Sequence, residues 1–268
     1  MKLTTRSILL AGAGALAVAV SGLLSSTASA AIVYGDFGPV GGFTITDVVE
    51  SSATDPVPLY DADGVVNDNG PTPFVVGVRF RPAMFGANAA GGGADVTDGQ
   101  LNFGVQGGPI QSISFSERGD YSLFGTGTAV TRVGAGIGAT VKVTHIDGVD
   151  LLNDNNPSND NIVISGNASV AFNLLANAGI TEDWSLGLTI DINGGLTSQG
   201  VSFVNGATQV EVFLNDTLLA ISEPASIALI VKKDFVVTVN PVIPEPSTFA
   251  LASLALCGAV AGVVRKRR

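Results

Sequence analysis

The chain has 268 residues, only 13% of them charged, and a formal net charge of −10 at pH 7. This acidity argues against nucleic acid as a partner, since phosphate recognition needs clustered Lys and Arg. The 34 glycines and the scarcity of charge favour short strands joined by turns over surface helices, which need a charged solvated face. Cys257 is the only cysteine, so the body of the chain is expected to fold without a disulfide or a catalytic thiol.

The N-terminus has the layout of a secretory signal. Lys2 and Arg6 provide a positive start, and residues 8–20 form an uncharged apolar run that is short for a membrane span. Ala28 and Ala30 flank Ser29 in a small-x-small pattern. We therefore expect residues 1–30 to be removed by signal peptidase after Ala30.

Strand periodicity dominates residues 31–240, which we interpret as one domain. Apolar residues alternate with polar ones in the segments 74–80, 110–115, 140–146, 168–174, 184–192, 209–214 and 235–239. Asn193-Gly194-Gly195 and Asn205-Gly206 are typical of tight hairpin turns. Without alternating helices a parallel α/β sheet is disfavoured. The predicted fold class is all-β, an antiparallel β-sandwich that is jelly-roll-like.

Two segments are rich in oxygen ligands. The first contains Asp61, Asp63 and Asp68, and the second spans residues 147–160. Calcium binds six to eight oxygens, which closely spaced Asp and Asn supply. Neither the EF-hand spacing nor its final Glu is present, and Asp, Asn and Gly also occur simply as turn residues. A calcium site at Asp61, Asp63 and Asp68 therefore stands beside a purely structural turn.

No catalytic constellation is evident, and we expect no enzyme activity. His145 is the single histidine and lies in an alternating strand, on the side of Val141 and Val143, which is typical of a core or half-buried position. Glu182 and Asp183 are strand neighbours, so their side chains point to opposite faces rather than toward one substrate.

The C-terminus carries three features in a fixed order. Pro244, Glu245 and Pro246 come first, and the uncharged residues 247–264 follow, about 27 Å long as a helix and enough for a bilayer. The chain then ends on a basic cluster, Arg265, Lys266, Arg267 and Arg268. Basic residues stay on the cytoplasmic side, which leaves the proline motif outside.

Residues 244–268 resemble the PEP-CTERM sorting domain of Gram-negative and related bacteria. The resemblance implies a tail (residues 241–268) recognised by an exosortase-type membrane processing enzyme, and an association with exopolysaccharide and biofilm production. The expected precursor is anchored in the inner membrane and its product reaches the cell surface or extracellular matrix.

Three functions for the body remain open. The first is a structural or adhesive surface or matrix protein linked to exopolysaccharide. The alternatives are a calcium-assisted carbohydrate-binding module and a polysaccharide-acting hydrolase.

Overall fold

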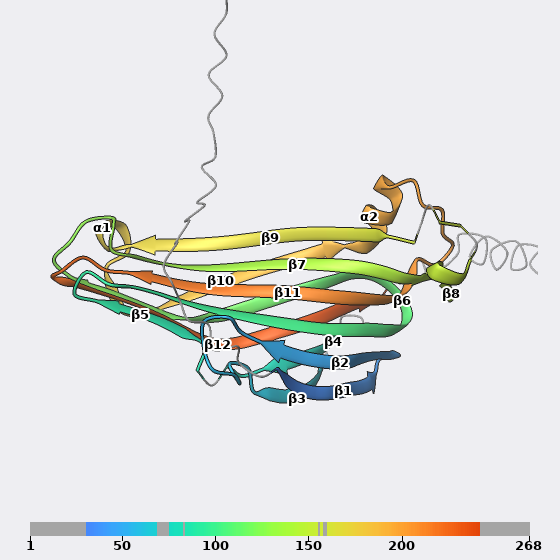
Figure 1. Ribbon diagram of the computed structural model, residues 1–268, viewed down its shortest axis with the longest axis horizontal. Coiled ribbons are helices and arrows are strands. Elements are labelled where there is room, and N and C mark those ends of the chain that lie inside the picture. The colour runs from blue at the N-terminus through green and yellow to red at the C-terminus, as the bar shows by residue number, and fades with distance from the viewer. Residues whose placement is uncertain (1–30, 69–74, 83, 155, 158–159, 242–268) are drawn as a thin grey trace, which may run out of the picture.

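Antiparallel strands make up most of the described chain. The computed structural model describes residues 31–68, 75–82, 84–154, 156–157 and 160–241. Its elements are β1 (Ile32–Val40), β2 (Phe43–Ser51), β3 (Ala62–Asp68), β4 (Val75–Phe80), β5 (Gly86–Ala90), β6 (Ala94–Gly125), β7 (Arg132–Ile146), β8 (Val149–Asp150), the 3-10 turn η1 (Leu151–Asn153), β9 (Ile162–Asn173), α1 (Leu174–Asn177), β10 (Gly179–Asp191), α2 (Ile192–Ser198), β11 (Ala207–Ile221) and β12 (Ser226–Pro241). The predicted antiparallel all-β character is confirmed (Figure 1).

The long strand β6 belongs to two layers. Its first half pairs with β2 and β11, and β7 and β9 continue the first layer beyond β11. Its second half pairs with β12 and β10, and β4 and β5 pair with the far side of β12. β11 of the first layer packs over β5 and β12 of the second. The two layers thus enclose the apolar side chains between them.

The passage of β6 between layers occurs at Gly107-Gly108-Pro109. Gly107 has a φ of +149°, a backbone conformation that residues with a Cβ avoid. It also lies against the backbone of Gly42 and Phe43, where a Cβ would overlap. The glycine therefore lets one strand bend out of the first layer and continue in the second.

Side-chain alternation decides what each face presents. On β7, for example, Val133, Ile137 and Val141 are buried, whereas Gly134 and Gly138 face outward. The segment 226–231, apolar but too short to span a bilayer, lies in β12, where Ser226, Ala228 and Ile230 are buried and the residues between them are partly exposed. The alternation of apolar residues in the sequence located these strands, because only one face of each strand reaches the core.

The prediction of two hairpin turns was wrong. Asn193-Gly194-Gly195 lies in α2, where Asp191 is the N-cap and its carboxylate accepts from Gly194 N. Asn205-Gly206 leads from α2 into β11 and joins no paired strands. Asn and Gly tolerate unusual backbone angles in any tight bend, not only in hairpins. Here one pair lies in the short helix and the other precedes a strand.

The two processing segments fall outside the described residues. These are the signal peptide, 1–30, including Ala28 and Ala30, and the tail from residue 242 onward, including Pro244–Pro246, the span 247–264 and the basic end 265–268. None of the helices in the described part of the chain has the length and apolar character that a bilayer span requires.

Candidate functional site

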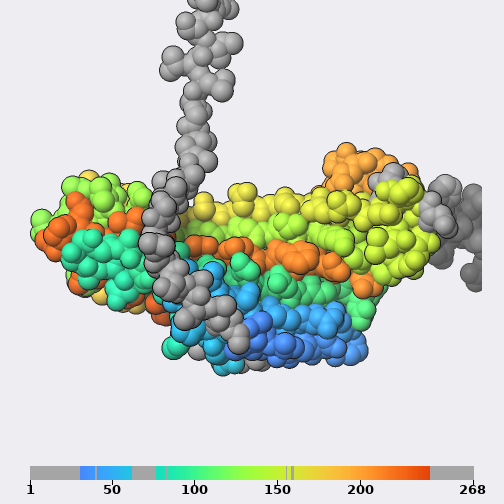
Figure 2. Space-filling model, viewed as in Figure 1, coloured from blue at the N-terminus to red at the C-terminus, as the bar shows by residue number. Residues whose placement is uncertain are grey.

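A shallow groove of about 600 Å³ lies on the outer face of the first layer. It is lined by Gln100 and Asn102 of β6, Phe213, Leu214 and Asn215 of β11, Gly138, Ala139 and Thr140 of β7, and Ser165, Gly166 and Asn167 of β9. This face is turned toward the viewer in Figures 1 and 2, where β9, β7, β11 and β6 follow one another. No lining side chain carries a formal charge.

Strand register assembles the groove in two rows. One row runs Gln100, Asn215, Gly138, Asn167 across β6, β11, β7 and β9. The row beside it runs Asn102, Phe213, Thr140, Ser165 across the same strands. Residues that are opposite one another in antiparallel strands point to the same face. Four strands far apart in sequence therefore present amides and hydroxyls together.

Phe213 provides an exposed apolar surface in the second row. Its side chain is 47% exposed, although its strand neighbours Val212 and Leu214 are buried. An aromatic ring that solvent reaches can stack on the apolar face of a flat ligand. The groove thus combines one ring with a set of neutral hydrogen-bonding groups.

Gly138 leaves space at the centre of the first row. A Cβ built on Gly138 would have its nearest neighbour, the carbonyl oxygen of Asn215, 4.0 Å away. Gly136, two residues earlier, is equally open. The missing side chains make a trough along β7, bordered by Asn215 on one side and Asn167 on the other.

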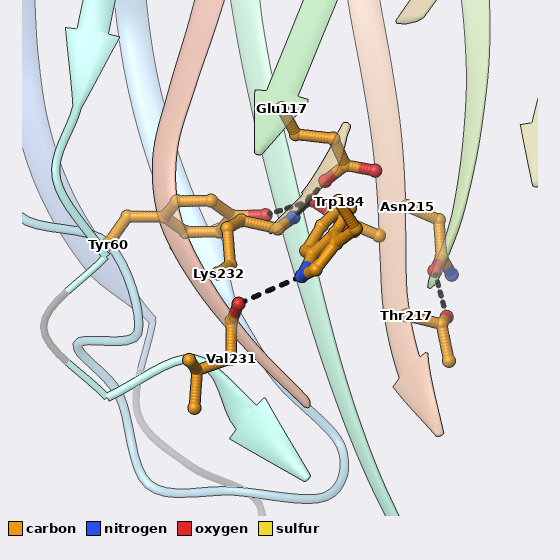
Figure 3. Close-up of polar contacts among 8 residues, drawn as sticks. Tyr60, Glu117, Trp184, Asn215, Thr217, Val231 and Lys232 are labelled. Carbon is orange, nitrogen blue, oxygen red and sulfur yellow. Dashed lines mark hydrogen bonds and ion pairs between the residues drawn. The ribbon is translucent and has the colours of Figure 1, made fainter. Parts of the chain in front are cut away.

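Hydrogen bonds orient part of the lining. Thr140 Oγ1 and Ser165 Oγ are 3.0 Å apart across β7 and β9. Ser51 Oγ donates to Gln100 Oε1 at 3.4 Å, and Thr217 Oγ1 donates to Asn215 Oδ1 at 3.4 Å (Figure 3). Amide side chains both donate and accept, so this surface suits a neutral ligand with many hydroxyl groups.

A second groove, of about 620 Å³, lies on the second layer and is strongly charged. Within it the carboxylate of Asp234 forms ion pairs with Arg118 Nη2 at 2.7 Å and with Arg79 Nε at 3.3 Å. Lys233 contacts Asp120. Trp184 is 3% exposed, and its indole N–H donates to the carbonyl oxygen of Val231 at 3.1 Å. The surface of this groove therefore consists of paired charges, and the Trp184 ring is too buried to stack against a ligand.

The first oxygen-rich segment is a strand and not a loop. Residues 62–68 form β3, which pairs with β4. Asp61 is exposed, and its backbone N–H and carbonyl exchange hydrogen bonds with Arg81. The side chains of Asp63 and Asp68 lie outside what the structure describes. Calcium at this segment stays a prediction.

Two carboxylates of the second oxygen-rich segment accept hydrogen bonds from backbone N–H groups. Asp147 accepts from the N–H groups of Val204, Asn205 and Gly206, and Asp150 accepts from Leu152 N at 3.0 Å as the N-cap of η1. Over the described ranges no group of three or more His, Cys, Asp and Glu side chains is placed to hold a metal ion.

His145 and the Glu182–Asp183 pair have structural surroundings. His145 is half-buried, as predicted, but a register shift near it makes Ile146 the buried residue at the end of β7. Glu182 and Asp183 are exposed neighbours within β10, and only Asp183 lines the charged groove. Their position in a strand separates them, as expected.

Sequence reasoning missed the groove, although one signal was present. The alternation Val210, Val212, Leu214 marks the inward face of β11, so Phe213 was recognisable as an aromatic on the outward face. The amides of β6 and β9 carry no such signal. Only strand register brings Gln100 and Asn167 into one row.

Comparisons with known proteins find similarity among solved structures and not among family models or curated proteins. No protein-family model matches the chain, and no curated protein matches it. The solved carbohydrate-binding module TmCBM61, in complex with β-1,4-galactotriose, is similar at 10% identity and a TM-score of 0.19, over 68% of this chain and 87% of that chain. TmCBM27, a carbohydrate-binding module studied for specific mannan recognition, is similar at 9% identity and a TM-score of 0.24, over 77% and 98%.

Proposed function

We propose that this chain is an exported, jelly-roll-like β-sandwich protein that binds a neutral polysaccharide through the groove on β6, β11, β7 and β9. The observation that carries the proposal is the pair of rows across four strands, with Phe213 exposed among Asn, Gln, Ser and Thr. Sugars combine apolar ring faces with hydroxyl groups, which aromatic rings and amides match. The role is non-catalytic adhesion to an extracellular matrix.

Delivery to that matrix rests on the two ends of the chain. The signal sequence up to Ala30 and the tail from Pro244 are the basis for proposing export and exosortase sorting. An uncharged groove on an acidic body suits a neutral polymer better than an acidic one, because like charges repel. The proposal therefore unites the structural or adhesive role with carbohydrate binding.

The hydrolase alternative has less support from the groove. Glycoside hydrolysis commonly uses a pair of carboxyl groups on either side of the scissile bond, and the groove lining contains neither Asp nor Glu. Of the charged residues beside the lining on this face, Lys142 and Glu211 form an ion pair at 3.6 Å, and Asp98, two residues before Gln100, accepts hydrogen bonds from Thr54.

Calorimetric titration with a panel of neutral and acidic polysaccharides tests the proposal. Phe213→Ala should weaken binding of a neutral polymer about tenfold, since an aromatic contact contributes about 1.5 kcal/mol. Gly138→Thr should abolish binding by filling the trough, while leaving the fold intact because space is available there.

Gly134→Thr is the matched control, since Gly134 also faces outward on β7 but lies outside the groove lining. Absence of heat with every neutral polysaccharide, or unchanged affinity in both groove variants, would refute the proposal. Repeating the titration with millimolar calcium and with chelator tests the calcium-assisted version separately.

A further inference from the structure

A lysine and two carboxylates lie together inside the sandwich. The side chains of Lys232, Glu117 and Asp216 are all fully buried. Lys232 Nζ contacts Glu117 Oε2 (Figure 3). It also contacts Asp216 Oδ2. Tyr60 Oη donates to Asp216 Oδ2 at 3.0 Å. This Lys232 cluster serves neither the polysaccharide groove nor the charged groove.

The three residues come from different strands and from both layers. Asp216 lies in β11 of the first layer, and Lys232 lies in β12 of the second. Glu117 lies in the second half of β6. Contact between Lys232 and Asp216 therefore spans the core, and both side chains of this pair, like those of Lys232 and Glu117, have 0% exposure.

Aromatic rings exclude water from the cluster. Lys232 Nζ is 4.3 Å from the ring centroid of Phe85, 5.4 Å from that of Phe235 and 5.7 Å from that of Tyr60. Gly99, opposite Asp216, makes room for them, since a Cβ there would meet Phe85 at 2.5 Å and Tyr60 at 3.1 Å. A dry site removes the solvent that would otherwise favour separate ions.

The charges in this dry site do not balance. One ammonium faces two carboxylates, and desolvation makes such an arrangement costly. Glu117 Oε1 and Asp216 Oδ1 are buried without a hydrogen-bond partner among the described residues. Burial lowers the pKa of Lys232 to about 8, although Glu117 raises it in part. A neutral amine, which is a nucleophile, is therefore accessible.

We propose that Lys232 and Asp216 condense into an intramolecular isopeptide bond, with Glu117 as the catalytic proton carrier. The amine of Lys232 attacks Cγ of the protonated Asp216 carboxyl group, and Glu117 takes a proton from the attacking nitrogen. Glu117 returns this proton to the departing hydroxyl. An Nζ–Cγ bond forms, one Cγ–O bond breaks and one water leaves, so the reaction needs no oxidant or external reactant.

The bond would connect the two layers of the sandwich covalently. The described residues contain no cysteine, so no disulfide can perform this task. The condensation also removes one buried positive and one buried negative charge, which lowers the desolvation cost of the cluster. The proposal is independent of what the groove binds.

Mass spectrometry of the purified protein tests the bond. Once the termini are assigned from terminal peptides, the intact mass should be lower than the sequence mass by one water molecule. Chymotrypsin cleaves after Leu218 or Leu219, between the two residues, and should still release a branched peptide containing both Asp216 and Lys232. Folded wild-type protein with the full sequence mass, or a water loss located elsewhere, would overturn the proposal.

Three variants separate the chemistry from folding. Lys232→Ala and Asp216→Ala should each restore the full mass, and Glu117→Gln should do so while retaining both reacting residues. Lys142→Arg, at the exposed ion pair with Glu211, is the matched control and should keep the loss of water. Unchanged bond formation in Glu117→Gln would eliminate the role of Glu117. If Lys232→Ala does not fold, the intact masses of the wild-type protein and of Glu117→Gln still test whether the bond forms.

Discussion

Trp184 connects β10 to the backbone of β12 by a side-chain hydrogen bond. It lies opposite Gly119 in β10 and β6, and its indole N–H reaches the Val231 carbonyl at 3.1 Å. Pairing of β12 with β6 shifts register just beyond this point. A Cβ on Gly119 would come within 2.9 Å of the indole nitrogen. The glycine and the tryptophan therefore form one structural unit.

Trp184→Phe should lower the free energy of unfolding by about 1–3 kcal/mol, because the Val231 carbonyl loses a donor and the buried ring loses packing volume. Urea denaturation followed by circular dichroism measures the change. Ser185→Ala, at the exposed neighbour, should change stability by less than about 0.5 kcal/mol. Equal stability of Trp184→Phe and wild type would contradict this role.

Asp147 connects two elements that are distant in sequence. It follows β7 with a positive φ of 51°, and its carboxylate accepts hydrogen bonds from Val204, Asn205 and Gly206, just before β11. Burial raises the pKa of Asp147, but the three backbone hydrogen bonds together lower the pKa by more than burial raises it, so the net shift is downward. The carboxylate thus fastens the end of β7 to the entry of β11.

Asp147→Asn should destabilise the protein at neutral pH and make little difference in acid. A lowered folded pKa means that the contribution is present above the unfolded Asp pKa of about 3.9 and disappears as pH falls through the folded value. Asparagine keeps the tolerance of positive φ. Urea midpoints of both proteins from pH 7 to pH 2 should converge at low pH, and a constant difference would contradict the hydrogen-bond account.

Strands were more predictable than the elements between them. Alternation located parts of β7, β9, β10, β11 and β12, because burial of one face imposes a two-residue period. The same local reasoning misassigned Asn193-Gly194-Gly195 to a hairpin turn. These residues lie in α2, which at seven residues is too short to show a helical period. Local reasoning also did not reveal that β6 is a single strand of 32 residues, because Gly107-Gly108-Pro109 resembles a turn when pairing partners are unknown.

The last described strand, β12, reaches the first residue of the tail (residues 241–268) that the sequence predicts. β12 finishes at Pro241, and its pairing with β6 extends to that residue. Deleting residues 242–268 should leave the melting temperature unchanged, since no described strand is shortened, and should abolish membrane retention if the tail is the anchor. Thermal melts and cell fractionation measure the two effects.

Replacing Pro244 and Pro246 by Ala is the matched control for that deletion. This variant keeps the apolar span and basic end, so it should remain in the membrane unprocessed. Localisation of the truncated protein identical to that of the full chain would refute the sorting role of the tail.

Composition, alternation and the order of motifs at the ends were sufficient to predict an exported, antiparallel β protein with a sorting tail. These features are local, since a strand period or a signal sequence is carried by neighbouring residues. The groove on the first layer and the Lys232 cluster are not local. Glu117, Asp216 and Lys232 are charged residues at inward positions of three strands, and only the register and the packing of the two layers brings them into contact. The same register unites Gln100, Asn215 and Asn167 on the outer face, because strand pairing, and not sequence distance, decides which side chains meet.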